Sequence, residues 1–126
     1  MRLSQVIREQ RANRRRRALS QTVWELPIES RQAMLRALED EELIVGAYVD
    51  RHGRMCPTVA AFRRGARACV GGFPKAWDDF AQARRPRPAT QRERQILRAL
   101  LEESLVDSRA ATPQAHPDKQ PILAET

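Results

Sequence analysis

Lysine is almost absent from this chain, since it occurs only at Lys75 and Lys119 among 23 basic residues. Nearly all of the positive charge is therefore carried by arginine. The formal net charge of +7 favours an anionic partner, either nucleic acid or an acidic protein surface. An arginine excess with few lysines is also what a GC-rich genome produces through codon usage, so basicity alone does not establish nucleic-acid binding.

Long apolar runs are also lacking. No segment approaches the roughly 20 apolar residues that a membrane-spanning helix needs, and the first 20 residues have no apolar centre of a secretory signal. We therefore expect a cytoplasmic protein without a membrane partner. An arginine-rich organellar transit peptide is the alternative for the N-terminal segment. The only cysteines, Cys56 and Cys69, are expected to be reduced thiols in a bacterial cytoplasm.

Motifs of catalysis and metal binding are sparse. Gly71-Gly72 belongs to no phosphate-binding loop of the GxGxxG or GK[ST] kind. His52 and Cys56 lie across a predicted turn, where neighbouring arginines would lower the pKa of the thiol, but no third group is recognisable to orient the histidine. With Cys69 and His116 these residues also lack the paired short spacings of a zinc site. We expect no enzyme, no catalytic residue, no metal and no cofactor.

The apolar pattern is mainly helical. Pro27, Pro57 and Pro74 each suit the first turn of a helix and precede apolar residues at helical spacing. Thr90 and Glu93 form a capping box before another apolar run, and Thr22 with Glu25 has the same spacing. These signals predict a mostly α fold, a small bundle of four to five helices.

A short two-stranded β-ribbon is predicted at about residues 43–56. Residues 43–49 are rich in β-branched and aromatic types, and Asp50 to Gly53 has the composition of a tight turn. Gly46 within the first strand indicates a bulge or a close approach of another segment. The chain then divides into a basic N-terminal arm or helix (1–19), a globular helical domain (20–106) and a disordered C-terminal tail (107–126).

Arginine clusters are the candidate site. One cluster lies in the N-terminal segment, one at the ribbon turn and one on the helix that begins at Pro57. The last two clusters together resemble in outline a helix and wing that meets a duplex backbone. Arginine binds phosphate through a bidentate fork, and the Pro57 helix offers only Thr58 for reading bases. The predicted nucleic-acid-binding residues are Arg14, Arg15, Arg16, Arg17, Arg51, Arg54, Arg63, Arg64 and Arg67.

The sequence thus predicts a small basic regulatory or accessory protein that contacts nucleic-acid phosphates largely without base specificity, on DNA or RNA. The alternative is a helical protein–protein interaction module, a bacterial regulator or adaptor that binds an acidic protein and no nucleic acid. Its features are Trp77, Phe80 and the amphipathic helix Thr90–Leu105, which would form a homodimer if its leucine face were uncovered. A further hypothesis is that the acidic run Glu39 to Glu42 holds the N-terminal arginines when no partner is bound.

Overall fold

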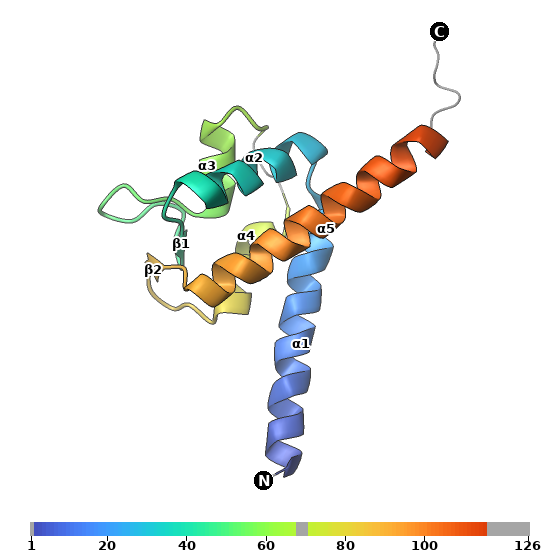
Figure 1. Cartoon of the computed structure of the whole chain (residues 1–126). Helices are drawn as coiled ribbons and strands as arrows, with labels where there is room; N and C mark the ends of the chain where they lie inside the picture. The colour runs from blue at the N-terminus through green and yellow to red at the C-terminus, as the bar shows by residue number, and fades with distance from the viewer. Residues whose placement is uncertain (1, 68–70, 116–126) are drawn as a thin grey trace, which may run out of the picture.

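The computed structural model describes residues 2–67 and 71–115, with side chains up to residue 106. Within them the chain forms five helices and two short strands (Figure 1). In chain order these are α1 (Arg2–Glu25), α2 (Ile28–Asp40), β1 (Ile44–Val45), α3 (Pro57–Arg63), α4 (Phe73–Ala81), β2 (Arg87–Pro88) and α5 (Gln91–Ala115). The predicted fold class, a mostly helical bundle with a short two-stranded ribbon, is confirmed.

Local signals account for most helix boundaries. Pro57 is the first residue of α3 and Pro74 lies in the first turn of α4, where a missing N–H costs no helical hydrogen bond. The capping box of α5 is formed in both directions: the backbone N–H of Thr90 donates to Glu93 (2.8 Å), and that of Glu93 donates to the Thr90 hydroxyl (3.1 Å). Gln82 ends α4 in the left-handed conformation, with φ 52°.

The Thr22 prediction was wrong. α1 continues through Thr22 to Glu25, and the Thr22 hydroxyl donates to the carbonyl of Leu19 (2.8 Å) within the same helix. The spacing of a capping box is therefore present without a helix start. The basic segment and the beginning of the globular domain form one continuous helix, which runs through the predicted boundary near residue 19.

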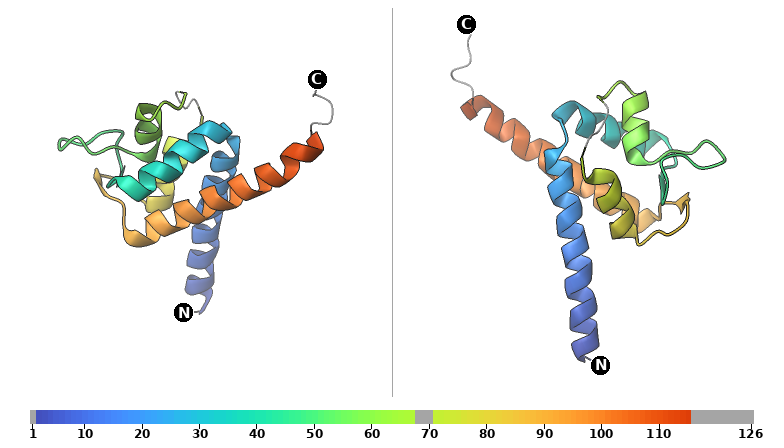
Figure 2. Two further views of the ribbon diagram at one scale, coloured as in Figure 1. Left: turned by 45° about the horizontal axis from the view of Figure 1, so that its top comes forward. Right: turned by 180° about the vertical axis from the view of Figure 1, so that it is seen from behind.

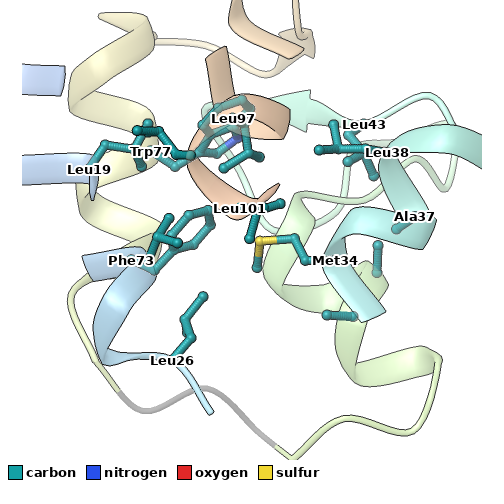
Figure 3. Close-up of a cluster of buried hydrophobic side chains, with 14 of the residues drawn as sticks. Leu19, Leu26, Met34, Ala37, Leu38, Leu43, Phe73, Trp77, Leu97 and Leu101 are labelled. Atoms are coloured by element: carbon teal, nitrogen blue, oxygen red, sulfur yellow. The ribbon is translucent and has the colours of Figure 1, made fainter. Parts of the chain in front are cut away.

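The core lies where α1, α2, α4 and α5 meet (Figure 3). Its largest side chain, Trp77, is fully buried and stacks between Phe73 and Phe80, with ring centroids 6.3 Å apart in both pairs. The indole N–H of Trp77 donates to the carbonyl of Ile44 (3.0 Å), which satisfies its one polar atom. The aromatic residues thus anchor a core that is otherwise aliphatic.

Arg31 joins α1, α2 and α5 at the edge of this core. It is only 6% exposed, and its guanidinium donates to the carbonyls of Trp24 (2.7 Å) and Leu26 (2.9 Å). A third, longer bond reaches the carbonyl of Ser104 on α5 (3.4 Å). Because the last carbonyls of a helix have no partner within it, Arg31 serves as a side-chain cap for the C-terminus of α1.

The ribbon has a different partner strand from the predicted one. β1 pairs antiparallel with β2, in the register Ile44 with Pro88 and Val45 with Arg87. Residues 48–56 form the predicted turn as a narrow hairpin, but only isolated bridges join it to the first strand. β1 ends just before Gly46, whose φ of +87° is not that of a strand. A Cβ at this position would lie 2.3 Å from the Arg85 carbonyl oxygen. The close approach predicted at Gly46 is therefore present.

α5 extends beyond the predicted start of the tail. It runs to Ala115, so residues 107–115 are helical, whereas residues 116–126 lie outside the described residues. The C-terminal end of α5 projects from the body (Figure 2), where a helix needs no apolar face for packing. An apolar pattern in the sequence therefore indicates burial and does not mark where a helix ends. None of the helices in the described residues is long and apolar enough to cross a bilayer.

Candidate nucleic-acid interface

The N-terminal part of α1 projects from the body (Figures 1 and 2), and α4 lies beside it over residues 11–18. Its only buried residues are Leu19 and Val23, near the C-terminal end. Arg14, Arg16 and Arg17 are exposed, and Arg15 is half-buried. The four arginines therefore point in different directions around one helix and do not form a single flat patch.

The carboxylates of the described residues form their ion pairs with basic side chains outside this run. No ion pair in the described part of the chain involves Arg14 to Arg17, and α1 contains only Glu9 and Glu25 as acidic residues. Adjacent like charges repel one another along a helix. The helix therefore presents positive charge that no ion pair within the described residues neutralises.

The arginines of the hairpin are in two different situations. Arg51 is exposed at its tip, whereas Arg54 pairs with Asp50 (Nε to Oδ2, 2.7 Å) and with Glu42 (3.5 Å). The hydrogen bond with Asp50 raises the pKa of Arg54. Partial burial would raise the pKa of Asp50, but hydrogen bonds from Arg54 and His52 lower it. Arg54 is thus part of the hairpin's own structure.

The arginines at the C-terminal end of α3 divide in the same way. Only Arg63 lies in this helix, which ends there, so the prediction that Arg64 and Arg67 lie on it was wrong. Arg63 and Arg67 are exposed, but Arg64 contacts Glu41 (2.9 Å) and Asp40 (3.3 Å) at the end of α2. The hydrogen bond with Glu41 raises the pKa of Arg64. Of the five predicted arginines outside α1, only Arg51, Arg63 and Arg67 remain without an ion pair in the described residues.

The acidic run Glu39 to Glu42 does not hold the N-terminal arginines. Its carboxylates pair instead with Arg54, Arg64 and, through Glu39, with Arg98 (3.8 Å). The predicted contact with residues 14–17 was therefore wrong. The reason is geometric, because α1 leaves the body on a side away from the end of α2 (Figure 1).

A groove that the sequence did not reveal lies between α1 and α4. Its volume is about 460 Å³. The residues that line it are Arg11, Arg14, Arg15, Ala18, Gly72, Lys75, Ala76 and Asp79. Arg11, Arg14, Arg15 and Ala18 stand at i, i+3, i+4 and i+7, so their common helix face was readable from the sequence. The sequence did not show that this face lies next to Lys75 on α4.

The cysteine and histidine positions do not form an activated pair. His52 is exposed at the hairpin turn, while Cys56 is buried at the N-terminus of α3. Burial raises the pKa of the Cys56 thiol, so the expected lowering by nearby arginines was wrong. Cys69 and His116 lie outside the described residues. Among the residues described, no three histidine, cysteine or acidic side chains are grouped to hold a metal ion.

The features cited for a protein-interaction module are largely used inside the chain. Trp77 is buried and Phe80 packs against the core. A homodimer through α5 was expected only if the leucine face of this helix were uncovered. Within one chain this face is already covered. These leucines are at most 6% exposed: Leu97, Leu100, Leu101 and Leu105. Exposed apolar side chains occur elsewhere, and those on the hairpin and α3 are Tyr48, Val49 and Phe62.

No model of a known protein family, no curated protein and no solved structure matches this chain. Its site is therefore interpreted from its own geometry and charge.

Proposed function

We propose that this protein is a small regulatory or accessory protein of the cytoplasm that binds nucleic acid through arginine–phosphate contacts, largely without base specificity. The role proposed is binding rather than catalysis. One observation carries the proposal: Arg14 to Arg17 stand without ion pairs in the described residues, on a helix that projects from the body, whereas Arg54 and Arg64 are paired with carboxylates.

The weak intrinsic stability of such a helix favours a polyanionic partner that would stabilise it. A helix that is polar on all sides has little packing to stabilise it, and neighbouring arginines add repulsion. A phosphate backbone relieves that repulsion, and the displaced counterions provide the driving force. Because residues 8–17 of α1 are polar apart from Ala12, the side of the helix that faces away from α4 can contact the phosphate backbone of a duplex.

The experiment is fluorescence anisotropy with a labelled random duplex and a labelled single strand, repeated over a salt series. A variant with Arg14, Arg15, Arg16 and Arg17 all changed to alanine is compared with the wild type. The slope of log affinity against log salt should become shallower by about 0.9 for each phosphate of B-form DNA that the variant no longer neutralises. The ratio of duplex affinity to single-strand affinity then shows which form of nucleic acid the protein prefers.

The matched control removes the same charge elsewhere. Arg36, Arg51, Arg63 and Arg67 are exposed, lie outside α1 and have no ion pair in the described residues. Changing these four to alanine should leave most of the affinity. Equal losses of affinity in both variants would show that only the net charge matters. A loss of affinity in the control variant alone would show that the site lies outside α1. No binding by the wild type at low salt contradicts the proposal.

A protein-interaction role is the second candidate, and it is favoured by exposed apolar side chains. Tyr48 is 62% exposed, Val49 51% and Phe62 54%. An aromatic residue exposed to this degree is typical of an interface. If the wild type binds no nucleic acid, changing Tyr48 and Phe62 to serine and measuring loss of co-purifying protein is the test of this second role.

A further inference from the structure

The groove between α1 and α4 differs in its charge from two other hollows of the described chain. It contains four cationic side chains, Arg11, Arg14, Arg15 and Lys75, and one carboxylate, Asp79. A hollow beside the hairpin is lined by two carboxylates and a single lysine. The hollow at the end of α2 has all four acidic residues of the run and one arginine. Of these three hollows, the α1–α4 groove alone has a clear excess of positive charge.

Small residues create the groove. Ala18 on α1, Ala76 on α4 and Gly72 just before α4 line it, where larger side chains would fill the space between the helices. The arginines at positions 11, 14 and 15 stand along the α1 wall, and Arg15 is the one member of the four-arginine run that is partly buried. The groove therefore follows from alanine and glycine at the helix crossing with arginine on its rim.

Position in a groove changes how strongly these arginines act. A cleft in which one sign of charge predominates concentrates the field. Reduced solvent access strengthens the charge interactions of Arg15, which is half-buried, whereas Arg11, Arg14 and Lys75 are exposed. On the α4 side, Lys75 forms an ion pair with Asp79 (2.8 Å), and this hydrogen bond raises the pKa of Lys75. The excess of positive charge in the groove therefore comes from the three arginines of α1. Arg16 and Arg17, on the same helix, do not line the groove.

We propose that the α1–α4 groove is a phosphate-binding site, which seats one phosphate group of the nucleic-acid backbone between Arg11, Arg14 and Arg15 on one wall and Lys75 on the other. This deepens and rests on the proposed function. Arg15 also lines an adjacent hollow together with Arg84 beyond the end of α4. Asp78 and Asp79 line this adjacent hollow as well, so its charge is balanced and the excess of positive charge is a property of the groove itself.

The test compares two double variants of one helix. Arg11→Ala with Arg15→Ala removes two groove charges, and Arg16→Ala with Arg17→Ala removes two charges outside it. Duplex affinity is measured by anisotropy at a fixed salt concentration. The groove variant should bind about tenfold more weakly than the control variant, because its arginines make charge-assisted contacts with the same phosphate, whereas Arg16 and Arg17 do not line the groove. Equal losses in the two variants would overturn the groove and leave the proposed function intact.

A third variant changes the shape of the site and not its charge. Ala18→Leu fills the floor of the groove from an exposed helix position, where leucine is a good helix former. It should weaken duplex binding while circular dichroism and the melting temperature stay unchanged. Unaltered duplex affinity in Ala18→Leu would contradict a phosphate seated in the groove.

Calorimetry with sodium tripolyphosphate distinguishes a nucleic-acid backbone from a free phosphate compound. Tripolyphosphate should bind the wild type, bind Lys75→Gln more weakly, and compete with the duplex. If tripolyphosphate binds in the groove but the wild type binds no duplex at low salt, the phosphate site stands and its ligand is a free phosphate compound, while the proposed function fails. If neither ligand binds, both the groove site and the proposed function are overturned.

Discussion

The projecting half of α1 and the corner at the end of α2 are both dense in charge, but they use arginine in opposite ways. At the corner, Arg54 and Arg64 reach Glu42, Glu41 and Asp40, and their charge is neutralised within the chain. On α1 the arginines have no such partners in the described residues. The comparison shows that an arginine count does not locate an interface, since the distance to the nearest carboxylate decides what each arginine does.

The corner also shows why its arginines are structural. Consecutive carboxylates at the C-terminal end of α2 oppose the helix dipole, so nearby positive charge stabilises them. Arg94 of α5 donates to the backbone carbonyls of Leu38 and Glu41 at the same place, which satisfies acceptors that the helix leaves open. The arginines around α2 therefore complete a helix end, a task that no arginine in the described projecting half of α1 performs.

The most deeply engaged arginine should give the largest loss of stability. Arg31→Ala leaves the carbonyls of Trp24 and Leu26 without their donor in a buried position, and we expect a loss of about 3 kcal/mol in the free energy of unfolding. Urea denaturation measures it. Arg36→Ala, an exposed arginine on the same helix, is the control and should change stability by less than about 0.5 kcal/mol. Similar losses in both variants would show that Arg31 has no special role.

The pair of Arg87 and Glu93 should give the next largest effect. Glu93→Gln keeps an oxygen that can accept the hydrogen bond from the Thr90 N–H at the start of α5. It removes the negative charge of the carboxylate, which accepts two hydrogen bonds from Arg87 (3.0 and 2.9 Å). We expect a loss of about 1–2 kcal/mol in the free energy of unfolding at pH 7, measured by urea denaturation.

This second effect should also depend on pH. Burial raises the pKa of Glu93, but hydrogen bonds from Arg87 and Thr90 lower it, and the net shift is downward. The stabilisation is therefore complete above the unfolded value of about 4.3 and is lost as the pH falls through the folded value. Wild type and Glu93→Gln should thus converge in stability as the pH is lowered below about 4. A constant difference down to about pH 2 would exclude titration of Glu93 as the cause.

An exposed paired arginine should give a smaller change. Arg64→Ala breaks contacts with Asp40 and Glu41 that lie near the solvent, where ion pairs contribute little. The urea midpoint should fall by less than in Glu93→Gln, and duplex affinity should change less than in the Arg11→Ala, Arg15→Ala variant. A larger loss of affinity than in that variant would contradict the division between paired and unpaired arginines.

Removal of the unpaired arginines should give no loss of stability at all. Changing Arg14 to Arg17 to alanine relieves repulsion between neighbours, and alanine is the best helix former. The melting temperature should stay equal to that of the wild type or rise, while nucleic-acid affinity falls. A lower melting temperature would show that these side chains stabilise the fold and would count against an interface role.

Local sequence signals predicted most of the helices, because prolines and caps act within one turn. Pro57, Pro74 and the Thr90–Glu93 box each stand where a helix begins. The partner of β1 was missed because residues 87–88 are far away in the sequence and have no strand pattern of their own. The end of α5 was missed because its last turns leave the body, where no apolar pattern is needed.

The candidate site was predictable in part. The Arg14–Arg17 run is visible as a sequence, and its exposure follows from the absence of apolar residues around it. The pairing of Arg54 and Arg64 with the acidic run depends on how α2 and α3 pack, and the groove depends on how α1 crosses α4. Both are tertiary facts, which a single sequence does not encode in any short window.

The attachment of α1 through Leu19 and Val23, both near its C-terminal end, has a consequence for its dynamics. A helix held at one end opens from the other, so amide hydrogen exchange along α1 should slow steadily from Arg2 toward Glu25 while the core stays closed. The chain can therefore lose order in this helix by local unfolding without losing its fold. A bound polyanion would suppress that opening, and protection would then appear at amides that no part of the body touches.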